Sequence, residues 1–237
     1  AIVAPSPPPR GRLRPLKLMR LSPAGATGCL TAGLVSGALW SLAPVAASNA
    51  GLDARGVAIF IGVTVCGGAL SQWPFGRLSD RVDRRAVIAA AAGLSATAGI
   101  LLFLATQHWG AAVLPLAFAF GAFTFPIYGL SVAHANDHAD PSAFVQVSGG
   151  LLLLYGFGTM VGPVIGAAMM DQMRPESIFL ATALPHVALC GYAIWRVQRR
   201  APVPIDERED FKTIPAERAL TPQGSLLDPR AEGEQES

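Results

Sequence analysis

Long stretches without a charged side chain constrain what this chain can fold into. Asp, Glu, Lys and Arg are absent from residues 21–52, 56–76, 86–136, 141–170 and 177–195. A helix needs about 20 mainly apolar residues to cross about 30 Å of hydrocarbon, so each stretch meets or approaches the length of a span. The longest stretch has room for two spans, with a natural break at the polar and interfacial residues 107–110. Six transmembrane spans are therefore predicted.

The spans are expected to be helices in a membrane. Only 14% of the residues are charged, against about 25% in a soluble domain, and five such runs leave too little polar surface to face water. Strands of a membrane barrel would be about ten residues long with strict alternation, which Leu151–Leu154 does not show. The predicted fold is an all-α membrane protein with spans at 24–47, 55–76, 86–106, 111–133, 143–170 and 177–196.

The segments outside the spans differ in composition. Residues 1–22 are rich in Pro and Arg and are expected to form a cytoplasmic linker before the transmembrane domain, 23–197. Residues 198–237 are acidic, with almost no aromatic side chains, and are expected to be a disordered cytoplasmic tail because they cannot bury enough apolar surface to offset the entropy of ordering.

Basic residues lie mostly on one side of the predicted spans. Twelve of the Lys and Arg residues lie before the first span, between the second and third, or after the sixth. Only Arg55 and Arg174 lie in the connections on the opposite side. Cytoplasmic loops near span ends carry such an excess, so both termini are expected in the cytoplasm. Membrane orientation thus explains the basic residues without a nucleic-acid partner.

The loop between the second and third spans is the most specific motif. It reads Gly76-Arg77-Leu78-Ser79-Asp80-Arg81-Val82-Asp83-Arg84-Arg85 and is predicted to be a tight, charged turn. Asp80 can pair with an arginine or a helix N-terminus, and such contacts can hold two helix bundles in one conformational state. A positive-inside loop with two incidental acids is the alternative.

The fifth span carries a second motif. Gly158, Gly162 and Gly166 fall on one helical face, where small residues let two helix backbones approach closely. Pro163 lies among them, removes one backbone donor and favours a kink. Ordinary helix packing without a gating role explains the spacing equally well.

Together these motifs resemble the major facilitator superfamily. The pattern Gly76-x-x-x-Asp80-Arg81-x-x-Arg84-Arg85 is similar to the signature loop between the second and third helices of each six-helix half, although that pattern usually has Gly where this chain has Asp83. The fifth span resembles the Gly-Pro motif of such halves. Residues 125–137 resemble the small YcaD-like subgroup, and the likeness extends over about residues 20–197.

The resemblance implies one half of a secondary transporter. A small solute, unknown from sequence, would cross a bacterial inner membrane by alternating access. The linker and the acidic ending suggest the C-terminal half, which would need a missing N-terminal six-helix half as its partner besides the lipid bilayer. Its gating residues would be Gly76, Asp80, Arg81, Arg84 and Arg85.

Polar and aromatic side chains within spans are candidates for the substrate pathway, since burying polar groups in hydrocarbon is costly. Packing remains the commoner use of aromatic residues. The candidates are Trp40, Gln72, Tyr128, Tyr155 and His186.

No enzyme activity, cofactor or metal is expected. The polar residues His134, Asn136, Asp137, His138 and Asp140 match no standard metal site, and a capped, solvated helix end explains them better. Cys29, Cys66 and Cys190 fall within spans and are interpreted as packing residues. A non-transporting scaffold derived from a half-transporter is the main rival. An intramembrane serine protease, using Ser36 or Ser148 with His186, is a weaker one because the motif glycine is missing before both serines.

Overall fold

The computed structural model of the chain describes residues 21–49, 51–106, 110–139 and 143–199. Nearly all of the predicted linker and tail, and residues 107–109 of the predicted break at 107–110, lie outside the described residues. Within the described part, six helical segments are long and apolar enough to cross a membrane. The prediction of an all-α protein with six spans is therefore confirmed.

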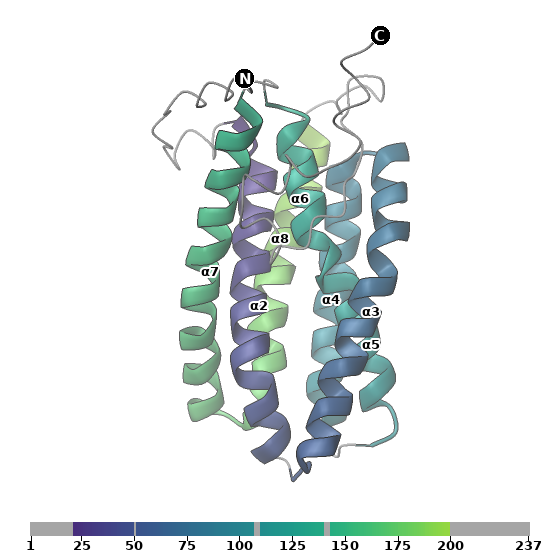
Figure 1. Cartoon of the computed structure of the whole chain (residues 1–237), viewed down its shortest axis with the longest axis vertical. Coiled ribbons are helices and arrows are strands. Elements are labelled where there is room, and N and C mark those ends of the chain that lie inside the picture. The colour runs from purple at the N-terminus through teal and green to yellow at the C-terminus, as the bar shows by residue number, and fades with distance from the viewer. Residues whose placement is uncertain (1–20, 50, 107–109, 140–142, 200–237) are drawn as a thin grey trace, which may run out of the picture.

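The helices are numbered along the chain as in Figure 1. A short 3₁₀ turn, η2, precedes the last of them. Their bounds are α2 Pro23–Asn49, α3 Ala54–Arg81, α4 Arg84–Thr106, α5 Val113–Thr124, α6 Pro126–Asn136, α7 Phe144–Gln172, η2 Pro175–Ser177 and α8 Ile178–Arg199.

The six spans form two sets of three that pack in the same way: α2, α3 and α4 in the first set, and α5–α6, α7 and α8 in the second. The most extensive packing joins α2 to α7, α4 to α8 and α3 to α5. Exchanging α2 with α5–α6, α3 with α7 and α4 with α8 reproduces the same pairs, as two structural repeats would. In the bundle α7 lies at one side and α3 at the other, with α2 and α8 between them (Figure 1). Consequently α3 and α7 are the spans least covered by the rest of the described chain.

Glycines set the spacing of two of these pairs. A Cβ on Gly162 of α7 would collide with the Leu34 carbonyl of α2, and a Cβ on Gly158 would lie 2.6 Å from the Leu30 oxygen. Across α3 and α5, a Cβ on Gly67 would collide with the Phe118 carbonyl. Both pairs therefore pack backbone against backbone, as expected where small residues line a helix interface.

The fourth span is two helices rather than one. Helix α5 ends at Thr124 and α6 begins at Pro126, although the intervening Phe125 keeps helical dihedral angles, with φ −67° and ψ −33°. Proline has no N–H and cannot donate to the carbonyl four residues earlier. The backbone ladder is therefore interrupted near the middle of the span, between its two ends at Val113 and Asn136.

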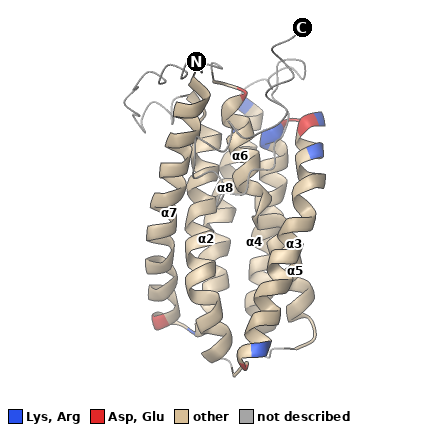
Figure 2. Cartoon of the chain, viewed as in Figure 1, with Lys and Arg blue, Asp and Glu red and all other residues tan. Residues whose placement is uncertain are grey.

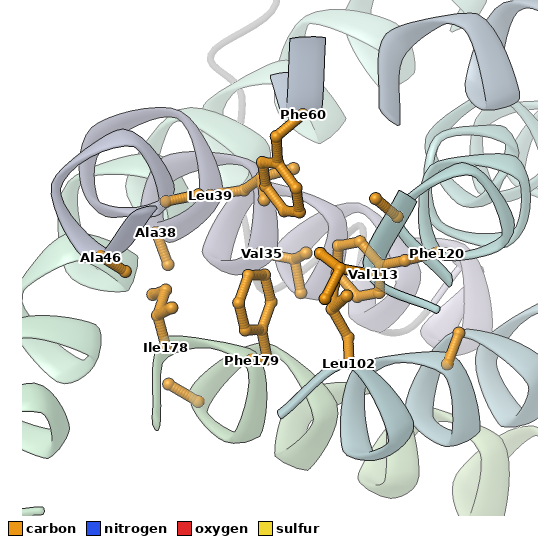
Figure 3. Packing of buried hydrophobic residues seen from close by; sticks show 14 residues of the cluster. Val35, Ala38, Leu39, Ala46, Phe60, Leu102, Val113, Phe120, Ile178 and Phe179 are labelled. Carbon is orange, nitrogen blue, oxygen red and sulfur yellow. The ribbon is translucent and has the colours of Figure 1, made fainter. Parts of the chain in front are cut away.

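A close-packed aromatic and aliphatic core joins the helices in the half of the bundle nearer the α2–α3 turn. Figure 3 shows how its side chains pack. Phe179 of α8 packs edge-on to Phe60 of α3 and Phe120 of α5, with ring centroids 5.9 and 6.4 Å apart. Val35 and Leu39 of α2 complete the centre of this cluster. The core fixes α2, α3, α5 and α8 relative to one another.

Charged residues of the described part of the chain lie only at the two ends of the bundle (Figure 2). One end, called the basic end below, carries six arginines and three carboxylates: Arg77, Arg81, Arg84, Arg85, Arg196, Arg199, Asp80, Asp83 and Asp137. The opposite end carries Asp53, Arg55, Asp171, Arg174 and Glu176. The hydrocarbon-length middle thus has no formally charged group among the described residues.

Candidate functional site

The turn between α3 and α4 is shorter than predicted from sequence. The predicted loop Gly76–Arg85 is largely helical, since α3 continues to Arg81 and α4 begins at Arg84. Only Val82 and Asp83 lie between the two helices. The prediction of a ten-residue turn is corrected in this respect, because the arginines and serine of the motif continue the α-helical ladder of α3 and α4 instead of leaving it.

Asp83 holds the start of α4. Its Oδ1 accepts a hydrogen bond from the backbone N–H of Arg85 at 2.9 Å, in the position of an N-cap residue. The Arg85 guanidinium also donates from Nε to Oδ1 at 3.1 Å and from Nη2 to Oδ2 at 2.8 Å. Partial burial acts to raise the pKa of Asp83, but the hydrogen bonds and positive charge of Arg85 outweigh it and lower the pKa below its usual value.

Arg84 is buried between two carboxylates. Its side chain is 2% exposed, and its Nη2 lies 3.1 Å from Asp80 Oδ1. Its Nε lies 2.9 Å from Asp137 Oδ2, and that carboxylate is also 2% exposed. Because Asp80 lies in the last turn of α3, Arg84 begins α4 and Asp137 follows α6, the three residues join three helix ends. Together with Asp83 and Arg85 they form the basic-end cluster.

Arg85 extends the cluster to α8. Its Nη1 donates a hydrogen bond to the backbone oxygen of Arg196 at 3.2 Å. That carbonyl belongs to the last turn of α8, where backbone oxygens lack partners within the helix. The cluster therefore connects α3, α4, α6 and α8 at the basic end.

Two other residues of the motif face outward. The side chains of Arg77 and Arg81 are exposed on α3, and the Arg77 guanidinium lies 5.3 Å from the ring centre of Trp73. Gly76 is buried and its carbonyl accepts from the Ser79 hydroxyl at 2.7 Å. The motif thus divides into a buried part within this bundle and an exposed part available to another surface.

The polar residues after the fourth span form the predicted solvated helix end only in part: His138 is exposed, but two of the others are buried. Asp137 is buried against Arg84, and His134 is 6% exposed with its ring 4.7 Å from that of His138. Asp140 lies outside the described residues. Across the described ranges no three His, Cys, Asp or Glu residues are placed to hold a metal.

The structure places the substrate-pathway candidates in two environments. Trp40 on α2 is 43% exposed, Gln72 on α3 is half-buried, and Tyr128 of α6 contacts Tyr155 of α7, with ring centroids 4.9 Å apart. His186, by contrast, is fully buried and packs edge-on to Phe120, with ring centroids 6.3 Å apart. A solute cannot reach His186 in this arrangement of the helices.

The serine residues considered for a protease are not paired with a base. Neither ring nitrogen of His186 is hydrogen-bonded to Ser36 or Ser148, and a catalytic dyad requires that bond or a close approach to it. Ser36 lies buried within α2. The geometry among the described residues gives no support to nucleophilic catalysis.

Two residues gain a role that sequence reasoning did not assign. Asp137 was considered only as part of a solvated cluster, and Phe125 only as part of a motif stretch. Phe125 stacks on Trp40 with centroids 5.9 Å apart and an angle of 10° between the rings. A useful signal for Asp137 is its place directly after the uncharged stretch 86–136, at the same predicted end as four arginines.

A pH dependence follows from the lowered pKa of Asp83. A lowered pKa means that the carboxylate stabilises the fold above its unfolded pKa, about 4, and that this stabilisation is lost as pH falls through the lower folded-state pKa. Asp83→Asn should therefore lower the unfolding temperature at pH 7, and the difference from wild type should shrink below about pH 4. A difference that is constant across pH would contradict the ionised cap. Melting curves between pH 7 and pH 3 measure it.

Comparisons with known proteins agree with this architecture. The sequence model of the Major Facilitator Superfamily matches residues 25–231. The chain is 30% identical over 169 residues to an uncharacterized MFS-type transporter of Enterobacter sp. (strain 638), covering 71% of this chain and 43% of that protein. It is also 30% identical over 165 residues to the uncharacterized MFS-type transporter YcaD of Salmonella arizonae, covering 70% and 42%.

The chain therefore spans less than half the length of these curated relatives. No solved structure matches it. The family model covers most of the chain, and the six apolar helices and the charged α3–α4 junction fit it. This chain belongs to the major facilitator superfamily.

Proposed function

We propose that this chain is one six-helix half of a transporter that moves a small solute across a bacterial inner membrane by alternating access. The observation that carries the proposal is the α3–α4 junction, in which part of a charged motif is buried in this bundle and part is exposed. Membership of a transporter superfamily and a middle layer free of charges among the described residues support it.

The proposed partner is a second six-helix half, which would pack on α3 and α7. These two spans are the least covered within the described chain, and large apolar side chains stand exposed on them, among them Leu70 and Trp73 of α3 and Phe157 and Met160 of α7. The matched region covers less than half of the relative from Enterobacter, so the remainder of a protein of that length is long enough to form a second six-helix half. Rocking of two halves around a midplane site would then give alternating access.

The basic end is proposed to face the cytoplasm. Six arginines stand there against two at the opposite end of the described chain, and an excess of Lys and Arg marks cytoplasmic loops. The basic-end cluster would keep the ends of α3, α4, α6 and α8 together as one rigid body. Arg77 and Arg81, which are exposed, would contact the other half when the cytoplasmic side is closed.

The test is a labelling experiment on the full-length transporter that needs no substrate. Cys66, the exposed cysteine of α3, is first replaced with alanine, and Ser41 on the exposed side of α2 is changed to cysteine. A membrane-impermeant maleimide is then added to inside-out vesicles. Asp80→Asn or Arg81→Ala should raise the labelling rate of Ser41→Cys severalfold, because the cytoplasmic gate opens more often, while leaving membrane insertion unchanged.

Arg55→Ala is the matched control, since Arg55 is an exposed arginine on the same helix but at the opposite end. It should leave cytoplasmic labelling as in the parent protein. Equal labelling of all variants at equal expression would overturn the gating assignment. Absence of labelling from either side of the membrane would favour the non-transporting scaffold instead.

A further inference from the structure

An exposed indole supported by a second ring lies partway along the bundle. Trp40 of α2 is 43% exposed and lies parallel to Phe125, with 5.9 Å between ring centroids and 10° between planes. Phe125 is itself held, because a Cβ on Gly68 of α3 would collide with its ring. The indole therefore rests on a ring that α3 and the α5–α6 junction keep in place.

A second aromatic pair continues toward the basic end. Tyr128 follows Phe125 by three residues, close to one helical turn, and meets Tyr155 of α7 edge to face, with 4.9 Å between centroids and 63° between planes. Both tyrosines are half-buried. Trp40, Phe125, Tyr128 and Tyr155 are called the aromatic strip, and they come from three spans that pack on one another.

Formal charge is absent from this depth of the described chain. The charged side chains of the described residues stand at the two ends of the bundle (Figure 2). Beside Trp40, the exposed positions of α2 include Ser41, Val45 and Ser48. The exposed side chains on this half of α2 thus offer hydroxyl and methyl groups, and the described residues at this depth include no guanidinium or ammonium that would pair with a phosphate or carboxylate.

We propose that Trp40, supported by Phe125, is the stacking platform for a solute that carries a planar aromatic ring system and is neutral or cationic. This proposal rests on the proposed function, because it identifies what class of solute the transporter would take. Aromatic faces carry a negative quadrupole, which favours offset stacking with another ring and attracts cations. An anionic solute would find no oppositely charged side chain on this wall.

Ring stacking on an exposed indole is worth about 1–2 kcal/mol, which corresponds to roughly a tenfold change in affinity. The probe is ethidium, a planar aromatic cation, and its binding to the purified full-length transporter is followed by its fluorescence. Trp40→Leu should raise the dissociation constant about tenfold, and Trp40→Phe should keep it within about threefold of wild type. Phe125→Leu should weaken binding to an intermediate degree, because it removes the ring beneath the indole.

Trp195→Leu is the control, because Trp195 is a similarly exposed tryptophan, 48% accessible, near the basic end of α8. It should leave ethidium binding unchanged. Three competitors test the solute class against ethidium. A neutral aromatic amide should compete well. Tetrapropylammonium, which has no ring, and naphthalene-2-sulfonate, which is an aromatic anion, should each compete at least tenfold less well than the amide. Equal binding by Trp40→Leu and wild type, or stronger competition by the sulfonate, would overturn the proposal.

Melting curves of the same variants separate the alternatives. If Trp40→Leu lowers the unfolding temperature but leaves ethidium affinity intact, Trp40 is a packing contact between the two halves and the proposal is wrong. The labelling of Ser41→Cys from the two membrane sides does not depend on any substrate. Normal two-sided labelling without Trp40-dependent ethidium binding would therefore reject the solute class while leaving alternating access in place.

Discussion

Replacing Arg84 with methionine should lower the free energy of unfolding by about 3–5 kcal/mol, the range measured when one partner of a buried ion pair is removed. Arg84 and Asp137 are each 2% exposed and lie 2.9 Å apart, so methionine would remove the guanidinium that neutralises a buried carboxylate. Asp80, which is 33% exposed, can turn toward water and contributes less to the loss. Thermal unfolding of the purified full-length protein measures the effect.

Two matched variants separate the buried charge from the loss of a side chain. Arg55→Met removes an exposed arginine at the opposite end of α3, which is not part of the proposed gate, and should change stability by no more than about 0.5 kcal/mol. Arg84→Met combined with Asp137→Leu removes both charges and should recover most of the stability, because an apolar pair of similar volume often replaces a buried ion pair without loss. If Arg84→Met were no worse than Arg55→Met, the two carboxylates would not depend on Arg84.

The spans could be predicted from sequence because their determinant is one-dimensional. A stretch without charges is long enough to cross the bilayer or it is not, and the predicted spans 24–47 and 86–106 differ from Pro23–Asn49 and Arg84–Thr106 by at most two residues at either end. The error was larger at the end of the second span. Helix α3 continues five residues beyond 76. Charged residues mark the point where a span leaves the hydrocarbon, but the helix itself can continue past that point into water.

The candidate site was less predictable because it depends on contacts between distant segments. Arg84 and Asp137 are 53 positions apart, and nothing in either local sequence specifies that α4 begins beside the end of α6. The same holds for Trp40 and Phe125, whose stacking depends on the crossing of α2 with the α5–α6 junction. Gly158, Gly162 and Gly166 could be placed on one face from their spacing alone, but their partner helix, α2, could not.

Asp83 illustrates a departure from a family pattern whose consequence only the structure shows. A carboxylate stands where the superfamily pattern usually has glycine. The chain instead uses the carboxylate as an acceptor for the Arg85 N–H at 2.9 Å and for its guanidinium. An N-cap of this kind stabilises a helix start by about 1 kcal/mol. The short turn between α3 and α4 is therefore kept, with a side-chain cap at the position where the family pattern has glycine.

Replacing Gly162 with leucine should be the most damaging change in α7. A Cβ at this position would collide with the Leu34 carbonyl and would lie 3.1 Å from the Ala38 nitrogen, and backbone atoms cannot move aside as a flexible side chain does. Overpacked sites cost about 1–3 kcal/mol and occasionally more, and a whole isobutyl group at a backbone crossing should reach at least about 3 kcal/mol. The measurement is thermal unfolding of the full-length protein in detergent.

Gly191→Leu in α8 is the control, because a Cβ on Gly191 meets nothing within 4 Å and α8 is not one of the two helices proposed to pack on the partner half. It should leave the unfolding temperature nearly unchanged. A damaging effect of Gly162→Leu alone would show that α7 is held against α2 by backbone contact, which also fixes Tyr155 beside Tyr128 and so the form of the aromatic strip. Equal effects of the two substitutions would contradict this crossing, and the position of Tyr155 relative to Trp40 would then have to be set by the partner half.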